Sequence, residues 1–283
     1  MKTLNFKLFM FVAIGSLFIT SCEKNNDVTL TDPISDADAI AVVEADDISD
    51  DINNVVDDYL MGNEGMSARP SQESKTSDIL PCVTKTIVIT GTTKNVTLDF
   101  GEGCELPNGN ILKGKIIMSY EVNTDVSSFT VTYSFENFFF NDISVEGENS
   151  LVRTRANDNG NPQSTLTFDM KVTWPDGVYA SRKGTKTREW IEGFDTRTFG
   201  DNVFLITGNW NATFKDGTVV SANITTPLRR EMSCRFIVSG VVELQKNDSS
   251  GTLDFGDGTC DNVAIFTNAN GESHEITLKG RMF

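Results

Sequence analysis

Few residues of this chain have the types and spacing that catalysis requires. His274 is its only histidine and has no nucleophile motif beside it, so we do not expect a serine, histidine and acid triad. Carboxylates are plentiful, and glycoside hydrolysis needs only two of them, roughly 5 to 10 Å apart. The first pair to consider is Glu189 and Glu192, which flank Trp190. On a continuous strand this spacing points them to opposite faces, so we assign no catalytic residue and no cofactor.

The densest basic patch of the sequence precedes Trp190 and is the first place to expect an anionic ligand. Its members are Arg182, Lys183, Lys186 and Arg188. A strand that is polar on both faces is either a solvated edge or the lining of a cavity, and we favour the edge. Trp174 and Trp210 are in phase with the apolar face of their strands, so we expect them in the core rather than on a sugar-stacking platform.

A second cluster of polar residues suggests a weaker hypothesis, a calcium site. Asp254, Asp257 and Asp261 bring hard oxygen ligands together, although their spacing does not match an EF-hand loop. The glycines between them favour a tight turn instead, in which aspartates accept backbone hydrogen bonds. We therefore expect a structural turn here and no metal.

An internal repeat organises the cysteines. Cys82 is followed by Leu-Asp-Phe-Gly-Glu-Gly-Cys ending at Cys104, and Cys234 by Leu-Asp-Phe-Gly-Asp-Gly-Thr-Cys ending at Cys260. The two related units span residues 82–115 and 234–281. The repeat selects the disulfides Cys82–Cys104 and Cys234–Cys260, each closing its own hairpin and each stabilising by roughly 3 kcal/mol in the chain-entropy model.

The elements before the first unit predict export and lipidation. Residues 1–21 contain two lysines and an apolar run from Leu8 to Ile19, which is typical of a secretory signal and too short to span a bilayer. The sequence Ile19-Thr20-Ser21-Cys22 resembles a lipobox, so we expect acylation of Cys22, with palmitate among the acyl chains, and a membrane attachment through this lipid. An ordinary secretory peptide with an incidental cysteine is the alternative.

An acidic arm and a linker connect the lipid to the body. Residues 22–61 are strongly acidic, and apolar residues recur there at helical spacing, which predicts an amphipathic helix from Ser35 to about Met61. The residues from Ser35 to Asp38 resemble a helix cap. We expect this helix to dock only weakly, and residues 62–81, with their glycines, proline and serines, to form a flexible linker.

The body, residues 82–283, is predicted to be one all-β domain. Apolar and polar residues alternate over stretches such as 165–174, 116–122 and 204–214, which indicates strands with one buried face. Asn-Gly and Asp-Gly pairs between these stretches are typical of tight hairpin turns. The simplest arrangement is an antiparallel meander that forms a sandwich or a barrel.

The net charge of the chain and a family resemblance further limit the functions to consider. With 40 acidic and 24 basic side chains the formal net charge is −16, which argues against nucleic-acid binding. The lipobox, the paired motifs, Thr187–Gly193 and Thr225–Glu231 together resemble an uncharacterised group of Bacteroidota-type lipoproteins without an established activity. That resemblance implies an outer-membrane lipoprotein whose body faces the periplasm or the medium.

Two functions remain as hypotheses. We favour a non-catalytic envelope module that binds a glycan or an envelope protein through its sheet surface, or has a structural role. The alternative is a carboxylate-dependent enzyme acting on surface glycans.

Replacing the lipidated residue tests the predicted anchor. Without the Cys22 thiol no acyl chain can be attached, so a Cys22→Ser chain is expected to lose palmitate label and to remain in the supernatant when vesicles are pelleted. A Ser21→Ala chain keeps the thiol and is the control. Sedimentation of the Cys22→Ser chain with vesicles would contradict lipid anchoring.

Overall fold

The computed structural model describes residues 32–63, 82–106, 109–121, 127–196 and 198–278. The signal, Cys22 and residues 64–81 of the predicted linker therefore lie outside the described residues. In the described part of the chain one α-helix, α1 (Asp36–Asn63), precedes the strands, and it includes residues 62–63, which were predicted to belong to the linker. The strands are β1 (Thr84–Thr90), β2 (Thr93–Asp99), β3 (Cys104–Glu105), β4 (Ile111–Glu121), β5 (Ser128–Phe140), β6 (Ile143–Thr154), β7 (Gln163–Thr173), β8 (Tyr179–Glu192), β9 (Val203–Phe214), β10 (Val219–Glu231), β11 (Ile237–Lys246), β12 (Ser249–Asp257), β13 (Val263–Thr267) and β14 (Ser273–Thr277), with a 3₁₀ turn η1 (Phe199–Asp201) before β9.

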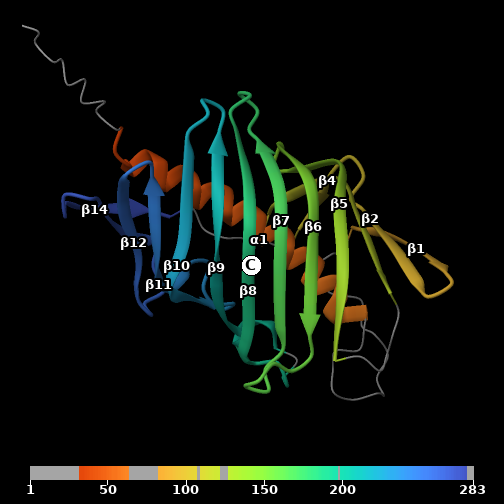
Figure 1. The fold of residues 1–283 in the computed structure, drawn as a ribbon. Coiled ribbons are helices and arrows are strands. Elements are labelled where there is room, and N and C mark those ends of the chain that lie inside the picture. Colours follow the sequence, from red (N-terminus) through yellow and green to blue (C-terminus); the bar gives the residue numbers. More distant parts are fainter. Residues whose placement is uncertain (1–31, 64–81, 107–108, 122–126, 197, 279–283) are drawn as a thin grey trace, which may run out of the picture. The chain divides into compact units, whose positions relative to one another are not determined.

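The strands form one antiparallel sheet in which spatial order follows chain order from β1 to β14, with the short β3 attached to β4 (Figure 1). This confirms the predicted all-β meander. The Asp-Gly turns work as expected at two hairpins, where Gly177 and Gly217 have φ of 78° and 87°. Beside them Asp176 and Asp216 accept hydrogen bonds from the N–H groups two residues on, at 2.9 and 2.8 Å.

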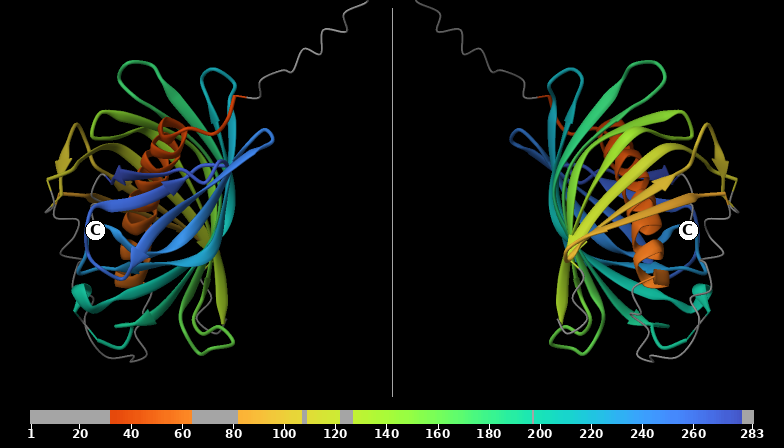
Figure 2. Two further views of the ribbon diagram at one scale, coloured as in Figure 1. Left: turned by 90° about the vertical axis from the view of Figure 1, so that its left-hand side faces the viewer. Right: turned by 90° about the vertical axis from the view of Figure 1, so that its right-hand side faces the viewer.

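The sheet is strongly curved, and α1 lies along its concave side (Figure 2). Buried residues of the helix and of the strands belong to one continuous hydrophobic core. The helix thus takes the place that a second sheet would occupy in a sandwich. Within the described residues the terminal strands β1 and β14 do not pair with each other.

Helix α1 is firmly packed, so the expectation of weak docking was wrong. Its buried apolar residues are Ala39, Val42, Ala45, Ile48, Ile52, Val55, Val56, Tyr59 and Leu60. The predicted cap is present, because the Asp38 carboxylate accepts from the Ser35 N–H at 2.9 Å and the Ser35 hydroxyl accepts from the Asp38 N–H at 3.2 Å. Within the described ranges no helix combines the length and the apolar character needed to cross a bilayer.

Both predicted disulfides are present. The Cα atoms of Cys82 and Cys104 lie 5.5 Å apart and those of Cys234 and Cys260 lie 5.8 Å apart. The first bridge brackets the hairpin β1–β2 and the second brackets β11–β12, so the two halves of the sequence repeat close equivalent hairpins.

Truncation of a buried helix residue measures how strongly α1 is docked. Ile52 is 0% exposed, so Ile52→Ala is expected to lower the free energy of unfolding by about 2 to 5 kcal/mol. Ile40, on the same helix but 42% exposed, provides the matched control, and Ile40→Ala is expected to change stability by less than about 1 kcal/mol. Equal effects in denaturant unfolding would show that the helix is not part of the cooperative core.

Candidate functional site: the ion-pair cluster between helix and sheet

The predicted basic patch lies on β8, which is a central strand and not an edge. It pairs with β7 on one side and with β9 on the other, so the expectation of a solvated edge was wrong and the cavity-lining alternative applies. Alternation along the strand turns Arg182, Lys186, Arg188 and Trp190 towards the concave side. Lys183 points to the opposite face, where it is exposed and contacts Asp169 at 2.9 Å.

Carboxylates of α1 meet these inward-facing bases. Asp46, Asp50 and Asp57 recur at intervals of four and seven residues, which places them on one side of the helix. The Lys186 Nζ lies 2.6 Å from an Asp46 oxygen and 3.0 Å from an Asp50 oxygen. Arg182 also donates to Asp46, and Arg153 of β6 donates to Asp57. We call these residues, together with Arg188, the ion-pair cluster.

The cluster is almost completely shielded from water. The side chains of Arg153, Arg182, Lys186, Asp46 and Asp57 are each at most 6% exposed. Removing such charges from water is costly unless they are paired with opposite charges, and the helix and the sheet provide that pairing for each other. The sheet bases therefore find their anionic partners inside this chain.

Aromatic rings support the same cations. The Lys186 Nζ lies 4.5 Å from the centroid of the Trp210 ring, and the Arg182 guanidinium lies 5.4 Å from it. The Arg188 guanidinium lies 3.7 Å from the centroid of the Phe204 ring. Such cation–π contacts stabilise cations that have lost water. Trp210 is buried in the core, as predicted, and Trp174 is partly buried and packs against that core.

Trp190 lies at one end of the cluster, where it is half-buried. It stacks on Phe204 with ring centroids 5.5 Å apart and meets Phe194 edge-on. With Arg153, Ser164 and Arg188 it borders a small cleft of about 20 Å³. Trp190 and Arg188 thus do lie together, as the sequence suggested, but inside the curve of the sheet.

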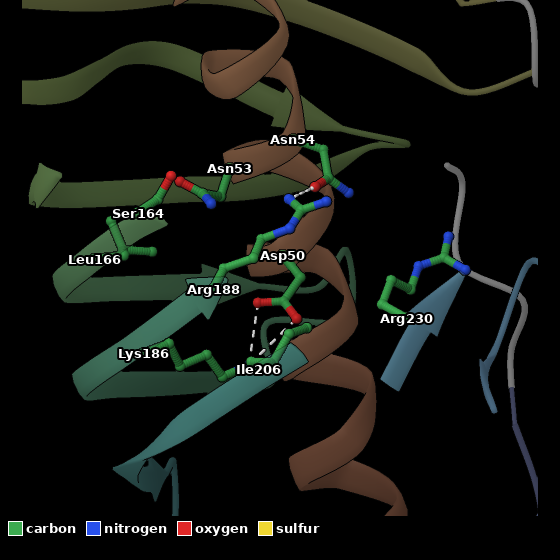
Figure 3. Close-up of a pocket in the computed structure, with 9 residues that line it drawn as sticks. All are labelled: Asp50, Asn53, Asn54, Ser164, Leu166, Lys186, Arg188, Ile206 and Arg230. Atoms are coloured by element: carbon green, nitrogen blue, oxygen red, sulfur yellow. Dashed lines mark hydrogen bonds and ion pairs between the residues drawn. The ribbon is translucent and has the colours of Figure 1, made fainter. Parts of the chain in front are cut away.

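A second polar cleft lies between α1 and strands β7 to β10 (Figure 3). Its lining residues are Asp50, Asn53, Asn54, Ser164, Leu166, Lys186, Arg188, Ile206 and Arg230. The cavity volume is about 30 Å³, which has room for about two water molecules. Arg230, which the sequence did not single out, donates to the carbonyls of Cys234 and Phe236. In the described structure this cleft has room for water but not for an organic ligand.

Both members of the acidic pair beside Trp190 are engaged in contacts within the chain. Glu189 accepts from the side-chain amides of Asn159 and Asn161 at 3.0 and 2.8 Å. Hydrogen bonds from Asn157, Asn159 and Asn161 hold the pKa of Glu189 below its usual value, so it is a poor proton donor. Glu192 contacts Arg229 at 3.0 Å.

The calcium hypothesis is not supported either. Asp254 accepts from the Gly256 N–H, Asp257 from Thr259, and Asp261 from the Val263 N–H, as expected of structural turns. The described residues contain no group of three or more histidine, cysteine or carboxylate side chains placed to hold a metal ion.

Two further contacts fix the start of the helix. The Lys246 Nζ lies 2.7 Å from Asp32 and 3.1 Å from Asp38. The hydrogen bond to Asp32, which has the larger effect, and the one to Asp38 raise the pKa of Lys246. His274 is about half exposed and faces Asp36 at 3.3 Å. The only histidine thus contacts the helix N-terminus.

Comparison with protein-family models, curated proteins and solved structures finds no match to this chain.

Removing one partner of a buried pair tests the cluster. Asp57→Asn leaves Arg153 buried without its counter-ion and is expected to lower the free energy of unfolding by about 3 to 5 kcal/mol. Combining Asp57→Leu with Arg153→Met removes both charges of this pair and is expected to recover part of that loss, because Arg188, 3.6 Å from Asp57, still loses this contact. The exposed pair Lys113–Asp142 is the control, because Asp142→Asn is expected to cost less than about 1 kcal/mol. The measurement is chemical denaturation of the unsubstituted chain and the three variants. Equal losses of stability in Asp57→Asn and Asp142→Asn would contradict the assignment of Asp57 to a buried ion pair.

Proposed function

We propose that this chain is a non-catalytic cell-envelope module, anchored through lipid on Cys22, that binds its partner through the outward face of the sheet. The observation that carries the proposal is the occupation of the inward face by the chain's own helix. There the sheet bases Arg153, Arg182 and Lys186 are paired with helix carboxylates. A partner is therefore expected on the other face.

The outward face offers an unusual surface for an acidic protein. Cross-strand neighbours form a row of uncharged hydroxyl and amide side chains from β4 to β10, which we call the polar row: Ser119, Thr132, Ser150, Thr167, Thr185, Asn209 and Asn223. The next row on the same face carries three adjacent charged residues on β6, β7 and β8, namely Glu148, Asp169 and Lys183. They are flanked by uncharged Ser134 and Asn211. Charged side chains of these three strands thus lie beside the polar row and not within it.

The chemistry of the polar row suits a neutral partner rich in hydroxyl groups. Hydroxyl and amide side chains both donate and accept hydrogen bonds, and they carry no charge that must be desolvated. Adjacent strands lie about 4.8 Å apart, so the row presents such groups at regular intervals. We favour a neutral glycan, or an envelope protein with a similar surface, as the partner. Lipid anchorage at the outer membrane, facing the periplasm or the medium, would hold the module beside such material.

We do not favour the enzymatic alternative. The two acids that the sequence singled out are held by Asn159 and Asn161 in one case and by Arg229 in the other. The carboxylates of the cluster act as counter-ions to arginine and lysine.

A binding screen with matched charge changes tests the proposal. A Cys22→Ser chain is screened on a glycan array and against solubilised envelope proteins. Thr167→Glu combined with Asn209→Glu adds two negative charges to the polar row and is expected to weaken binding at least tenfold, about 1.4 kcal/mol. Lys183→Glu makes the same change in net charge on the neighbouring row and is expected to leave binding intact. If both variants bound the partner as tightly as the unsubstituted chain does, the polar row would not be the binding face.

A further inference from the structure

Within the described residues, one edge of the sheet has few of the features that normally protect an edge strand. β1 pairs only with β2 in the described part of the chain, over seven residues and without a bulge. Its sequence, Thr-Lys-Thr-Ile-Val-Ile-Thr, has no proline and one charge, at Lys85. Ile87, Val88 and Ile89 are 46%, 54% and 64% exposed. A long, apolar and unpaired edge of this kind is a template for another strand.

The opposite edge of the same sheet provides a comparison. β14 spans five residues, includes Glu275, and has its His274 beside Asp36 of the helix. Short length and charge are the usual ways in which proteins blunt an edge. The chain therefore protects one edge and leaves β1 apolar.

The exposed isoleucines continue the apolar inner face beyond the part that the helix covers. Ile87 lies opposite Val96, which is fully buried, and Lys85 on the same side of β1 reaches the Tyr59 ring at 5.7 Å. Ile87 and Ile89 lie on this side by alternation, whereas Val88 points to the outward face.

We infer that β1 is an interface through which two copies of this chain pair antiparallel and join their sheets. A pairing centred on Val88 places Val88 opposite its own copy and Ile87 opposite Ile89. Thr86 then faces Thr90, and Lys85 faces Gly91, so no lysine meets a lysine. Apolar pairs directly opposite each other stabilise a sheet, and a two-fold arrangement closes without forming a filament.

Charge also favours this edge for self-association. A chain with a net charge of −16 repels its copies, and that repulsion is weakest where acidic side chains are missing. β1 contains none, and its partner β2 carries Lys94 opposite Ile89. This inference is independent of the proposed binding face.

Cysteine crosslinking in native membranes tests the symmetric contact. A full-length Val88→Cys chain is expected to form a disulfide-linked dimer on mild oxidation, because the substituted residues face each other across the two-fold axis. Val219, which is 48% exposed on β10, is the control, and Val219→Cys is expected to crosslink several-fold less. Equal crosslinking, or adducts only with other proteins, would overturn the inference. Protection of Val88→Cys from aqueous maleimide without a dimer would favour a bilayer contact and would overturn it as well.

Opposite charges introduced at Val88 provide a second test, again with full-length chains. Val88→Lys alone and Val88→Glu alone each place like charges face to face and are expected to abolish co-purification of two differently tagged copies. Mixing the Lys chain with the Glu chain is expected to restore it. Circular dichroism of each variant verifies folding. Failure of the mixture to recover pairing, or pairing of either variant alone, would contradict a two-fold contact at Val88.

Discussion

The described structure depends on the pairing of helix carboxylates with bases that point inward from the sheet. Neither partner is stable alone in this position, because Arg182 and Lys186 without anions would be buried cations and Asp46 would be a buried anion. Together they allow a helix with an acidic side to pack inside a curved sheet. The pairing also explains why α1 is buried on its polar side as well as on its apolar side.

This neutralisation determines which surfaces are available to other molecules. The concave face of a curved sheet is an obvious place for a ligand, but here α1 fills it, and the two clefts described above have volumes of only about 30 and 20 Å³. The outward face and the free strand edge remain. They differ in character, because the polar row offers uncharged hydrogen-bonding groups whereas β1 offers apolar side chains and unpaired backbone groups.

Local patterns predicted much of this fold. Alternation and Asp-Gly turns identified the strands, and the sequence repeat identified both disulfides, because each of these signals lies within one hairpin. The helix was also predicted with its cap at Ser35. Its docking was not, since the partners Asp46 and Arg182 are 136 residues apart and nothing local links them. The residues of the basic patch were recognised, but an inward-facing Arg182 and an outward-facing Lys183 cannot be distinguished without knowing that β8 is a central strand. Arg153 also points inward. It was missed because it lies on β6, and no local pattern links it to its partner Asp57 on the helix.

The ionic contacts also determine where the helix sits along the sheet. Apolar packing alone tolerates a shift of one helical turn, because Ile48, Ile52, Val56 and Leu60 follow one another at intervals of four residues and would replace one another with modest changes in volume. The charged residues do not tolerate it. A shift of four residues would bring Asn53 or Met61, according to its direction, to the position of Asp57 beside Arg153, and a buried guanidinium would lose its counter-ion. A buried ion pair adds little net stability compared with apolar residues of the same size, but its loss is expensive. Spacing the acids along α1 to match bases on β6 and β8 therefore selects one position of the helix.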